Sequence, residues 1–443
     1  MARVVPFRGV VYSPSKIQDL ADVTTPPYDV ISPEDQTAFY NQHPHNIIRL
    51  ILGKTFETDT AADNRYTRSA AFFNDWLAEG VLVQDTKPAI YLTSTEFSIH
   101  SQSFTRWGMI AQVALEPFDK GIVLPHEKTF SHVKSERLEL MKACHANFSP
   151  IFSLYSDPAQ TILNLLRQSS SGQTPDMTLT DTTACKQRLW RILDPAIHRK
   201  ISEDMAHTSL FIADGHHRYE TALNYRKWIA DNTPGFTPDH PANFIMMYLC
   251  AMEDPGLVIL PTHRILKPGK SQNADTLIEA ASTFCDIQKI VVDPASGIPT
   301  GEKSWEAFLD ANSPGTRIGV VIRNHSEACC LTPKPGVMQR LFGSEMTEAM
   351  LELDVTVLTR LLLIELLGLD SEQLDKEGVI TYSSRIETAL EAVRSGSGEA
   401  AFILNPTRID QVKRIAESGE TMPRKSTYFH PKVITGQVLN RLI

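Results

Sequence analysis

The sequence predicts a mixed α/β protein, of the α+β or α/β kind, with more than one domain. The chain has 443 residues, whereas a single hydrophobic core seldom grows beyond about 250–300 residues. Apolar residues make up 42% of the chain and charged residues 21%, which is close to the average of globular proteins. Strand-like and helix-like segments alternate along most of its length. We therefore expect several domains with buried cores.

The first part of the chain combines short strands with helices. Residues 89–98 and 104–115 alternate apolar and polar side chains on either side of a short polar turn, which predicts an antiparallel hairpin. Residues 66–82 carry apolar side chains at helical spacing, and residues 47–52 form a short β-like run. These elements predict an N-terminal α+β domain over residues 1–165.

A polar segment at residues 168–179 is interpreted as a linker. It consists largely of Ser, Gly, Gln, Thr and Pro, which lack the apolar atoms needed to offset the entropy of ordering. Beyond it, residues 209–213 predict a strand, residues 217–230 a helix and residues 243–251 a second strand. Such a β-α-β succession is typical of a mostly parallel or mixed sheet.

Composition argues against several classes of protein. The formal net charge is -9, whereas non-specific nucleic-acid binding depends on Lys and Arg, so no nucleic-acid partner is expected. The six cysteines show neither a CxxC pair nor metal-ligand spacing, as in proteins of a reducing compartment. The strongest apolar run, residues 355–367, is too short to span a bilayer and contains two charged side chains. We expect a cytoplasmic protein without a membrane partner.

The strand-to-helix turn that begins at Asp214 carries the strongest functional signal. Gly215 permits a tight turn, Asp214 is placed to cap the helix that follows, and a helix start favours a bound anion. His216, His217 and Arg218 add hydrogen-bond donors, because Arg binds phosphate through two parallel bonds and His exchanges protons near neutral pH. The alternative interpretation is structural, with a capping Asp, a packed His pair and an Arg in a surface ion pair. Metal binding by two adjacent helical histidines is not expected, since their side chains point about 100° apart.

Two further segments carry candidate site residues. In the loop at residues 124–129, Glu127 is placed to accept a proton from a hydroxyl and Lys128 to bind phosphate. His263 and Arg264 follow the Asp214 helix and are expected at the edge of the same crevice. The alternatives are an exposed polar loop and a structural His with a surface Arg.

Two segments near the ends of the chain are also candidates. Asp29 follows a rigid Pro-Pro-Tyr turn and either holds Mg²⁺ or caps the helix that begins near Pro33, the cap being favoured. Residues 422–429, including Lys425, combine cations, hydroxyls and aromatic rings, which suits a segment that closes over a charged ligand. A basic segment facing solvent is the alternative. The chain contains no GxxxxGK(S/T), GxGxxG, HExxH or GxSxG pattern, which excludes the commoner nucleotide, zinc and serine-hydrolase motifs.

The Asp214 turn resembles that of a known superfamily. Residues 212–218, followed by Ala222, are similar to the strand, turn and helix of the ParB/sulfiredoxin-like superfamily. They are most similar to its free-serine kinases, whose turn reads DGHHR. The resemblance implies that this helix start holds the phosphate of a nucleotide or substrate, and that residues 244–251 form the next strand.

Over its whole length, the chain resembles a bacterial and archaeal family known as domain of unknown function 1015. Members of that family are often encoded beside serine-biosynthesis enzymes, so the resemblance implies serine or phosphoserine as the substrate. The similarity is carried by residues 6–9, 26–31, 124–129, 147–150, 214–218, 260–264 and 422–429.

Three hypotheses of function follow. In the first, the protein is a phosphotransferase that acts on the hydroxyl of a small metabolite, above all free L-serine or O-phosphoserine, with ATP or ADP and Mg²⁺. The turn would hold the phosphates, and Glu127 or Asp29 would be the base. In the second, it is a phosphoserine phosphatase with His216 or His217 as nucleophile or general acid. In the third, it is a ParB-like nucleotide-dependent binding protein without small-molecule catalysis, which the acidic balance disfavours.

The predicted domains follow from the same elements. The N-terminal domain at residues 1–165 precedes a ParB/sulfiredoxin-like phosphate-binding region, built on a β-α-β unit around residues 207–265, that covers residues 180–335. The remaining residues, 336–443, are expected to form an α/β segment that closes over the site.

Overall fold

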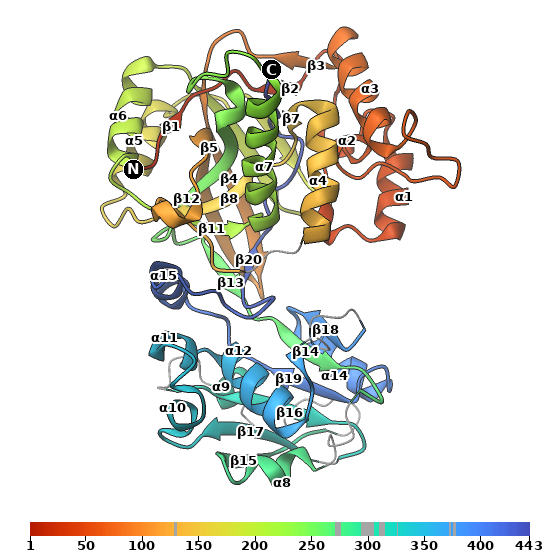
Figure 1. Cartoon of the computed structure of the whole chain (residues 1–443), viewed down its shortest axis with the longest axis vertical. Helices are drawn as coiled ribbons and strands as arrows, with labels where there is room; N and C mark the ends of the chain where they lie inside the picture. Colours follow the sequence, from red (N-terminus) through yellow and green to blue (C-terminus); the bar gives the residue numbers. More distant parts are fainter. Residues whose placement is uncertain are drawn as a thin grey trace. The chain divides into compact units, whose positions relative to one another are not determined.

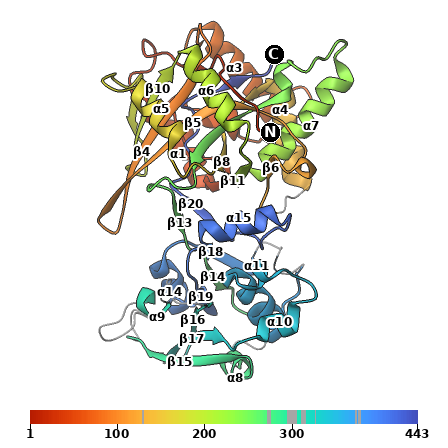
Figure 2. The same cartoon turned by 90° about the vertical axis from the view of Figure 1, so that its left-hand side faces the viewer.

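The chain forms two compact units (Figure 1, Figure 2). The computed structural model describes residues 1–127, 131–270, 276–293, 305–309, 315–325, 327–371, 374 and 378–443. The first unit comprises Met1–Pro125, Thr129–Val258 and Pro431–Ile443, and the second comprises His126–Lys128 and Ile259–His430. The mixed α/β, multi-domain fold predicted from the sequence is confirmed.

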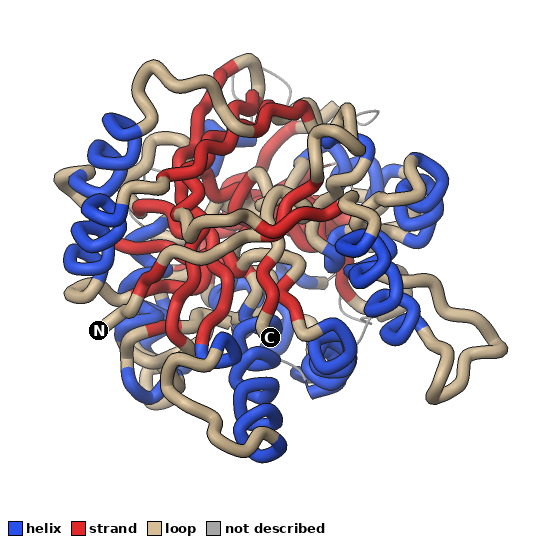
Figure 3. The backbone as a smooth tube through the Cα atoms, turned by 90° about the horizontal axis from the view of Figure 1, so that it is seen from above, coloured by secondary structure: helices blue, strands red, loops and turns tan. Residues whose placement is uncertain are grey.

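The units do not coincide with the three predicted segments. The chain leaves the first unit after Val258 and returns to it at Pro431, so that both termini belong to the same unit (Figure 3). Residues 168–179 do not form a linker, because they include the end of α5 (Thr161–Ser169) and most of β9 (Met177–Thr180). In β9 the two apolar side chains, Met177 and Leu179, are buried and alternate with exposed ones, which is the pattern of a strand. This polar segment therefore joins the sheet as its last strand.

The first unit is built around a nine-stranded mixed sheet with the order β6-β11-β8-β12-β5-β4-β10-β9, and β1 pairs with β5. The predicted hairpin is confirmed as β4 and β5, which pair antiparallel. The strands are β1 (Val4–Val5), β4 (Ile90–Ile99), β5 (Gln102–Ala114), β6 (Val123–Leu124), β8 (Ile151–Tyr155), β9, β10 (Lys186–Ile192), β11 (Leu210–Asp214) and β12 (Phe244–Ala251).

Helix α7 (His216–Asn232) joins β11 to β12, as the sequence predicted. The two strands are not neighbours, however, because β8 lies between them. β8 pairs antiparallel with β11 and parallel with β12, so β11 and β12 run in opposite directions. The segment is therefore not a simple parallel β-α-β unit.

Apolar side chains of α5, α6 (Pro195–Met205) and α7 pack on one face of this sheet. A second cluster lies among the helices of the N-terminal segment. Its members include α2, which forms where a strand was predicted at residues 47–52. Residues 47, 48, 50 and 51 are buried whereas Arg49 is only partly buried, and this spacing is that of one helical face rather than of an alternating strand. The Asn46 side chain also accepts a hydrogen bond from the Ile48 N–H, which starts a helical turn.

The remaining elements of the first unit are short strands and helices. They are β2 (Val10–Tyr12), β3 (Leu82–Gln84), β7 (Ala146–Asn147), β21 (Asn440–Arg441), η1 (Leu20–Asp22), η2 (Tyr28–Val30), η3 (Phe118–Lys120), η4 (Pro241–Asn243), α1 (Pro33–Gln42), α2 (Ile48–Ile51), α3 (Arg65–Ala78) and α4 (Ser131–Cys144).

The second unit has its own six-stranded sheet, with the order β15-β17-β16-β19-β14-β18. All of its strand pairs are antiparallel. The strands are β14 (His263–Leu266), β15 (Cys285–Val291), β16 (Ile318–Ile322), β17 (Glu327–Pro333), β18 (Ile380–Ser383) and β19 (Ala400–Ile403), and β13 (Val258–Leu260) pairs separately with β20 (Tyr428–His430).

The apolar run at residues 355–367 is buried in this second unit, mostly as the π-helix η5 (Val357–Leu366). In the described part of the chain, no helix combines the length and hydropathy needed to cross a bilayer. All six cysteines are buried free thiols. The other helices are α8 (Leu277–Ala281), α9 (Trp305–Leu309), α10 (Val337–Phe342), α11 (Glu348–Leu351), α12 (Asp354–Thr356), α14 (Ile386–Arg394) and α15 (Ile409–Glu417).

Candidate functional site

The turn between β11 and α7 is an ion-pair centre rather than a helix cap. Gly215 adopts a left-handed conformation with φ 98°, is the N-cap residue of α7, and no side chain caps the helix. The predicted cap by Asp214 is therefore wrong. The Asp214 carboxylate instead accepts a hydrogen bond from Lys432 Nζ at 2.8 Å and one from Arg218 Nη2 at 2.8 Å. Asp214 is the last residue of β11, one position before the N-cap residue of α7.

The charge state of Asp214 is determined by these partners. Its side chain is 16% exposed and that of Lys432 is 14% exposed. Burial raises the pKa of Asp214, but the charges of Lys432 and Arg218, the hydrogen bond from Lys432 and the charge of His216 together outweigh it, so the pKa lies well below its ordinary value. The carboxylate is thus ionised at neutral pH and holds both cations in fixed positions.

Arg218 folds back over the glycine of the turn. A Cβ atom on Gly215 would lie 2.9 Å from Arg218 Nη2, so this position requires glycine both for its backbone angle and for space. Arg218 also donates to the carbonyl oxygen of Pro150, and its side chain is only 13% exposed. The interpretation as a surface ion pair is therefore wrong, because the pair with Asp214 is largely buried.

The two histidines of the turn differ in environment. His216 is 5% exposed, and its charge contributes to the lowered pKa of Asp214. His217 is half-buried. Neither belongs to the walls of the cavity described next.

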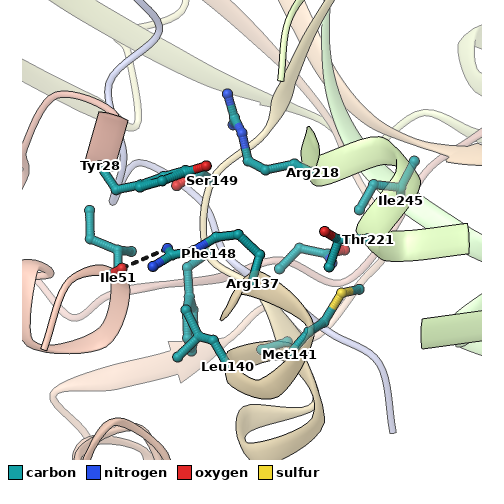
Figure 4. A pocket seen from close by; sticks show the side chains of 12 residues that line it. Tyr28, Ile51, Arg137, Leu140, Met141, Phe148, Ser149, Arg218, Thr221 and Ile245 are labelled. Atoms are coloured by element: carbon teal, nitrogen blue, oxygen red, sulfur yellow. Dashed lines mark hydrogen bonds between the residues drawn. The ribbon is translucent and has the colours of Figure 1, made fainter. Parts of the chain in front are cut away.

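A cavity of about 60 Å³ adjoins Arg218 (Figure 4). Its walls come from α4, α7, β12, η2, α2 and the segment from β7 into β8. Half of the lining residues are apolar, and the others carry two guanidinium groups, three hydroxyls and one amide (Figure 4). The lining residues are Tyr28, Ile51, Arg137, Leu140, Met141, Ala146, Asn147, Phe148, Ser149, Arg218, Thr221 and Ile245.

Arg137 of α4 supplies the second guanidinium. It lies 4.0 Å from the centroid of the Tyr28 ring, donates to the carbonyl oxygen of Ile51 at 2.8 Å and pairs with Glu136. Glu136 also pairs with Arg65 at 3.0 Å. Burial raises the pKa of Tyr28 despite the opposing charge of Arg137, so its hydroxyl is neutral at physiological pH.

The ion pairs around the cavity leave an excess of positive charge. Four cations, Arg65, Arg137, Arg218 and Lys432, share two carboxylates, those of Glu136 and Asp214. Asp29, on the same turn as Tyr28, is exposed to solvent. Of these groups, Arg137 and Arg218 line the cavity, and the other lining residues are uncharged, so an anion that enters the cavity meets two guanidinium groups and no carboxylate in its wall.

Thr221 lines the cavity and has a buried hydroxyl without a hydrogen-bond partner among the described residues. Its side chain is 2% exposed. It lies on α7 three residues after Arg218, so the two side chains share one face of the helix. Buried hydroxyls without a partner are uncommon, because leaving one unsatisfied costs about 1–3 kcal/mol.

The structure places the other predicted site residues elsewhere. Asp29 does not cap α1, since Ser32 is the N-cap residue and forms a capping box with Asp35, so the cap that the sequence favoured is wrong. Glu127 forms a parallel bridge with Met422 in the second unit. Lys128 lies outside the described residues.

His263 and Arg264 lie in β14 of the second unit's sheet, which is a different sheet from the one that contains β12. Both are buried. His263 Nδ1 accepts a hydrogen bond from the Leu404 N–H, and Arg264 donates to the carbonyl oxygens of Arg424 and Lys425. Burial lowers the pKa of Arg264 to about 10. The predicted surface Arg is therefore wrong, and Arg264 fixes the backbone of the segment that carries Lys425.

Lys425 itself has an exposed side chain and a backbone with φ 55°. Within the second unit, its carbonyl oxygen is therefore bonded while its ammonium group faces solvent. In the described residues, no group of three His, Cys, Asp or Glu side chains is arranged to hold a metal ion.

Sequence reasoning missed Lys432, Arg137, Tyr28 and Thr221. The sequence could have indicated Thr221, because its i+3 spacing from Arg218 places both residues on one face of the predicted helix. Lys432 is 218 residues from Asp214 in the chain, and no local pattern relates them.

Comparison with known proteins identifies the family of the chain. The family model described as "Protein of unknown function (DUF1015)" matches residues 4–356, which is about four fifths of the sequence, so the chain belongs to this family. No curated protein matches.

Solved structures show low similarity. A conserved hypothetical protein from Pyrococcus furiosus matches with 12% identity and a TM-score of 0.35, covering 76% of this chain and 97% of that one. A free serine kinase mutant in complex with AMP matches with 11% identity and a TM-score of 0.35, covering 73% and 87%. SbnI from Staphylococcus aureus, truncated at its C-terminus, matches with 9% identity and a TM-score of 0.33, covering 73% and 85%. Values of this size do not establish a shared activity, so the function has to be inferred from the site itself.

Proposed function

We propose that this member of the DUF1015 family is a phosphotransferase that moves a phosphoryl group between ATP or ADP and the hydroxyl oxygen of a small metabolite, with free L-serine as the acceptor and O-phosphoserine as its phosphorylated form. The observation that carries the proposal is the Gly215 turn, where Arg218 and Lys432 are held around one carboxylate beside a positively charged cavity. The similarity of the DGHHR turn to that of free-serine kinases supports the same assignment.

Arg218 and Lys432 are suited to bind a phosphoryl group. Phosphoryl transfer is catalysed mainly by positioning and by electrostatic stabilisation of the phosphoryl oxygens. Asp214 orients both cations before any ligand enters, so a phosphate meets donors that are already in place. Arg218 uses one Nη atom for Pro150 and the other for Asp214, and a guanidinium has five N–H donors in all. Donors therefore remain for a ligand.

The general base is proposed to be Asp29 or Glu127. Asp29 is an exposed carboxylate on the same short helix as Tyr28 of the cavity wall, whereas Glu127 belongs to the second unit. Mg²⁺ usually enters such sites with the nucleotide phosphates and needs only one or two protein carboxylates, which either residue supplies.

Hydrolysis of phosphoserine has no comparable support. A histidine nucleophile must reach the phosphorus atom, but His216 is 5% exposed and neither histidine of the turn lines the cavity. Hydrolysis is therefore treated as an outcome of the test rather than as a second proposal.

The test is phosphoryl transfer in both directions. Purified protein is incubated with L-serine and ATP, and separately with O-phosphoserine and ADP, in the presence of Mg²⁺, and products are followed by ³¹P NMR. We expect transfer that depends strictly on nucleotide. Release of free phosphate from O-phosphoserine without nucleotide would contradict the proposal and favour a phosphatase.

Variants of helix α7 give the matched control. Arg218→Lys keeps the charge but loses the planar fork, and we expect kcat/KM to fall by about 100-fold or more, as for loss of a transition-state donor. Lys227 lies on the same helix, is 77% exposed and pairs with Asp231, so Lys227→Gln should leave the activity unchanged. If the Arg218→Lys protein folded and its kcat/KM were unchanged, Arg218 would not be a phosphate-binding residue.

A further inference from the structure

We infer that the cavity beside α7 binds the carboxylate end of a small acid that carries a second polar group next to the carboxylate, such as a three-carbon hydroxy or amino acid, and that it does not enclose a nucleotide base. The inference deepens the proposed function, on which it rests for the role of this acid as phosphoryl acceptor. The binding site itself follows from the size of the cavity, the charge of its walls and one unsatisfied hydroxyl.

Size limits the part of a ligand that the cavity encloses. The cavity measures about 60 Å³, which is less than half of the about 150 Å³ of an engineered apolar cavity that binds benzene. It therefore encloses neither a nucleotide base nor a whole amino acid. It has room for a fragment of a few non-hydrogen atoms, such as a carboxylate and the polar group on the next carbon, while the rest of the ligand stays outside it.

Charge determines which end of the ligand faces the guanidinium groups. Arg137 and Arg218 lie in the wall together with apolar side chains of α4 and β12 (Figure 4), and the surrounding ion pairs contain two more cations than carboxylates. A carboxylate matches the planar donor pair of a guanidinium. In an apolar surrounding, this attraction is stronger than in water. A small carboxylic acid is therefore favoured over a neutral molecule.

The Thr221 hydroxyl indicates that the ligand has a second polar group. It is buried, lines the cavity and has no partner among the described residues. The neighbouring Ser149 hydroxyl, by contrast, already bonds to Thr435 at 2.9 Å. A hydroxyl or amino group next to the ligand's carboxylate would satisfy Thr221, and a site built to bond such a group discriminates against analogues that lack it.

The experiment measures binding without nucleotide, by isothermal titration calorimetry of the full chain. The probes are L-serine, L-lactate, propionate and adenosine, which carries the base without a phosphate that could bind Arg218. We expect L-serine or L-lactate to bind at least about tenfold more tightly than propionate, which lacks the second polar group, and adenosine not to compete with them. Failure of both L-serine and L-lactate to bind, or competition by adenosine, would overturn the inference.

Thr221→Val tests the hydroxyl with an isosteric change. Because the lost hydroxyl has no protein partner, Tm should stay the same or rise, while the Kd of L-serine or L-lactate rises by about tenfold or more. The control is Thr93→Val, whose hydroxyl donates to the Gly108 carbonyl oxygen on β5. This variant should lower Tm and leave Kd unchanged. An unchanged Kd in Thr221→Val would show that Thr221 does not contact the ligand and would overturn the inference.

The two proposals fail in different ways. Binding of L-serine that depends on Thr221, without phosphoryl transfer to it under any nucleotide condition, would reject the phosphotransferase and keep the acid-binding cavity. Phosphoryl transfer with a KM for L-serine that is the same in Thr221→Val would keep the enzyme and reject the cavity as its acceptor site.

Discussion

Replacing Lys432 by Met removes one of the two cations that hold Asp214. Both side chains are largely buried, at 14% and 16% exposure, and their atoms are 2.8 Å apart. Hydrogen bonds to charged groups contribute about 1.5–3 kcal/mol each, and Arg218 remains as a partner, so we expect a loss of about 2 kcal/mol at pH 7. For a unit of this size, that corresponds to a fall in Tm of about 4–8 °C.

The pH dependence of this loss has a defined sign. The pKa of Asp214 is lowered in the folded protein, so its ion pairs stabilise the fold above the unfolded pKa of about 3.9. This contribution is lost as the pH falls from about 4 through the folded pKa, because the unfolded state then binds the proton first. The difference in the free energy of unfolding between wild type and Lys432→Met should therefore be constant between about pH 5 and 7 and should shrink below about pH 4.

Urea unfolding at several pH values measures both effects. The control is Lys227→Met, because the exposed pair of Lys227 with Asp231 on α7 is expected to contribute less than about 1 kcal/mol. If Lys432→Met were as stable as the control at pH 7, the ion pair of Lys432 with Asp214 would not stabilise the fold as described. The same conclusion would follow if the difference in the free energy of unfolding from wild type grew as the pH was lowered.

Two further substitutions test the surroundings of the turn. Gly215→Ala combines an unfavourable φ of 98° with a contact of 2.9 Å to Arg218 and should cost about 1–3 kcal/mol. Gly121 also has a positive φ, of 66°, but open space around it, so Gly121→Ala should destabilise the protein less than Gly215→Ala. If calorimetry gave the two variants the same Tm, the close contact between position 215 and Arg218 would not contribute to the loss of stability. Arg106→Leu removes the donor that holds the Pro431 carbonyl oxygen at 2.7 Å, so hydrogen exchange in the C-terminal segment should become faster. Unchanged protection there would show that Arg106 does not anchor that segment.

Local patterns in the sequence were sufficient to locate most elements. The hairpin of β4 and β5 and the strand, glycine and helix around Gly215 were predicted within a few residues, because alternation and turn chemistry act over short distances. The predictions failed where burial overrides local preference. The run at α2 is buried at residues 47, 48, 50 and 51, with helical spacing, and folds as a helix. The polar segment before β10 joins the sheet through β9.

By itself, the sequence determined that a cationic turn follows a buried strand, since Asp214, Gly215 and Arg218 are close in the chain and share one local geometry. Only the tertiary structure decided what surrounds that turn. Lys432 reaches Asp214 across 218 residues, and Arg137 comes to the cavity on a different helix. Such pairs arise from the packing of distant segments, which no periodicity within a short window of sequence records.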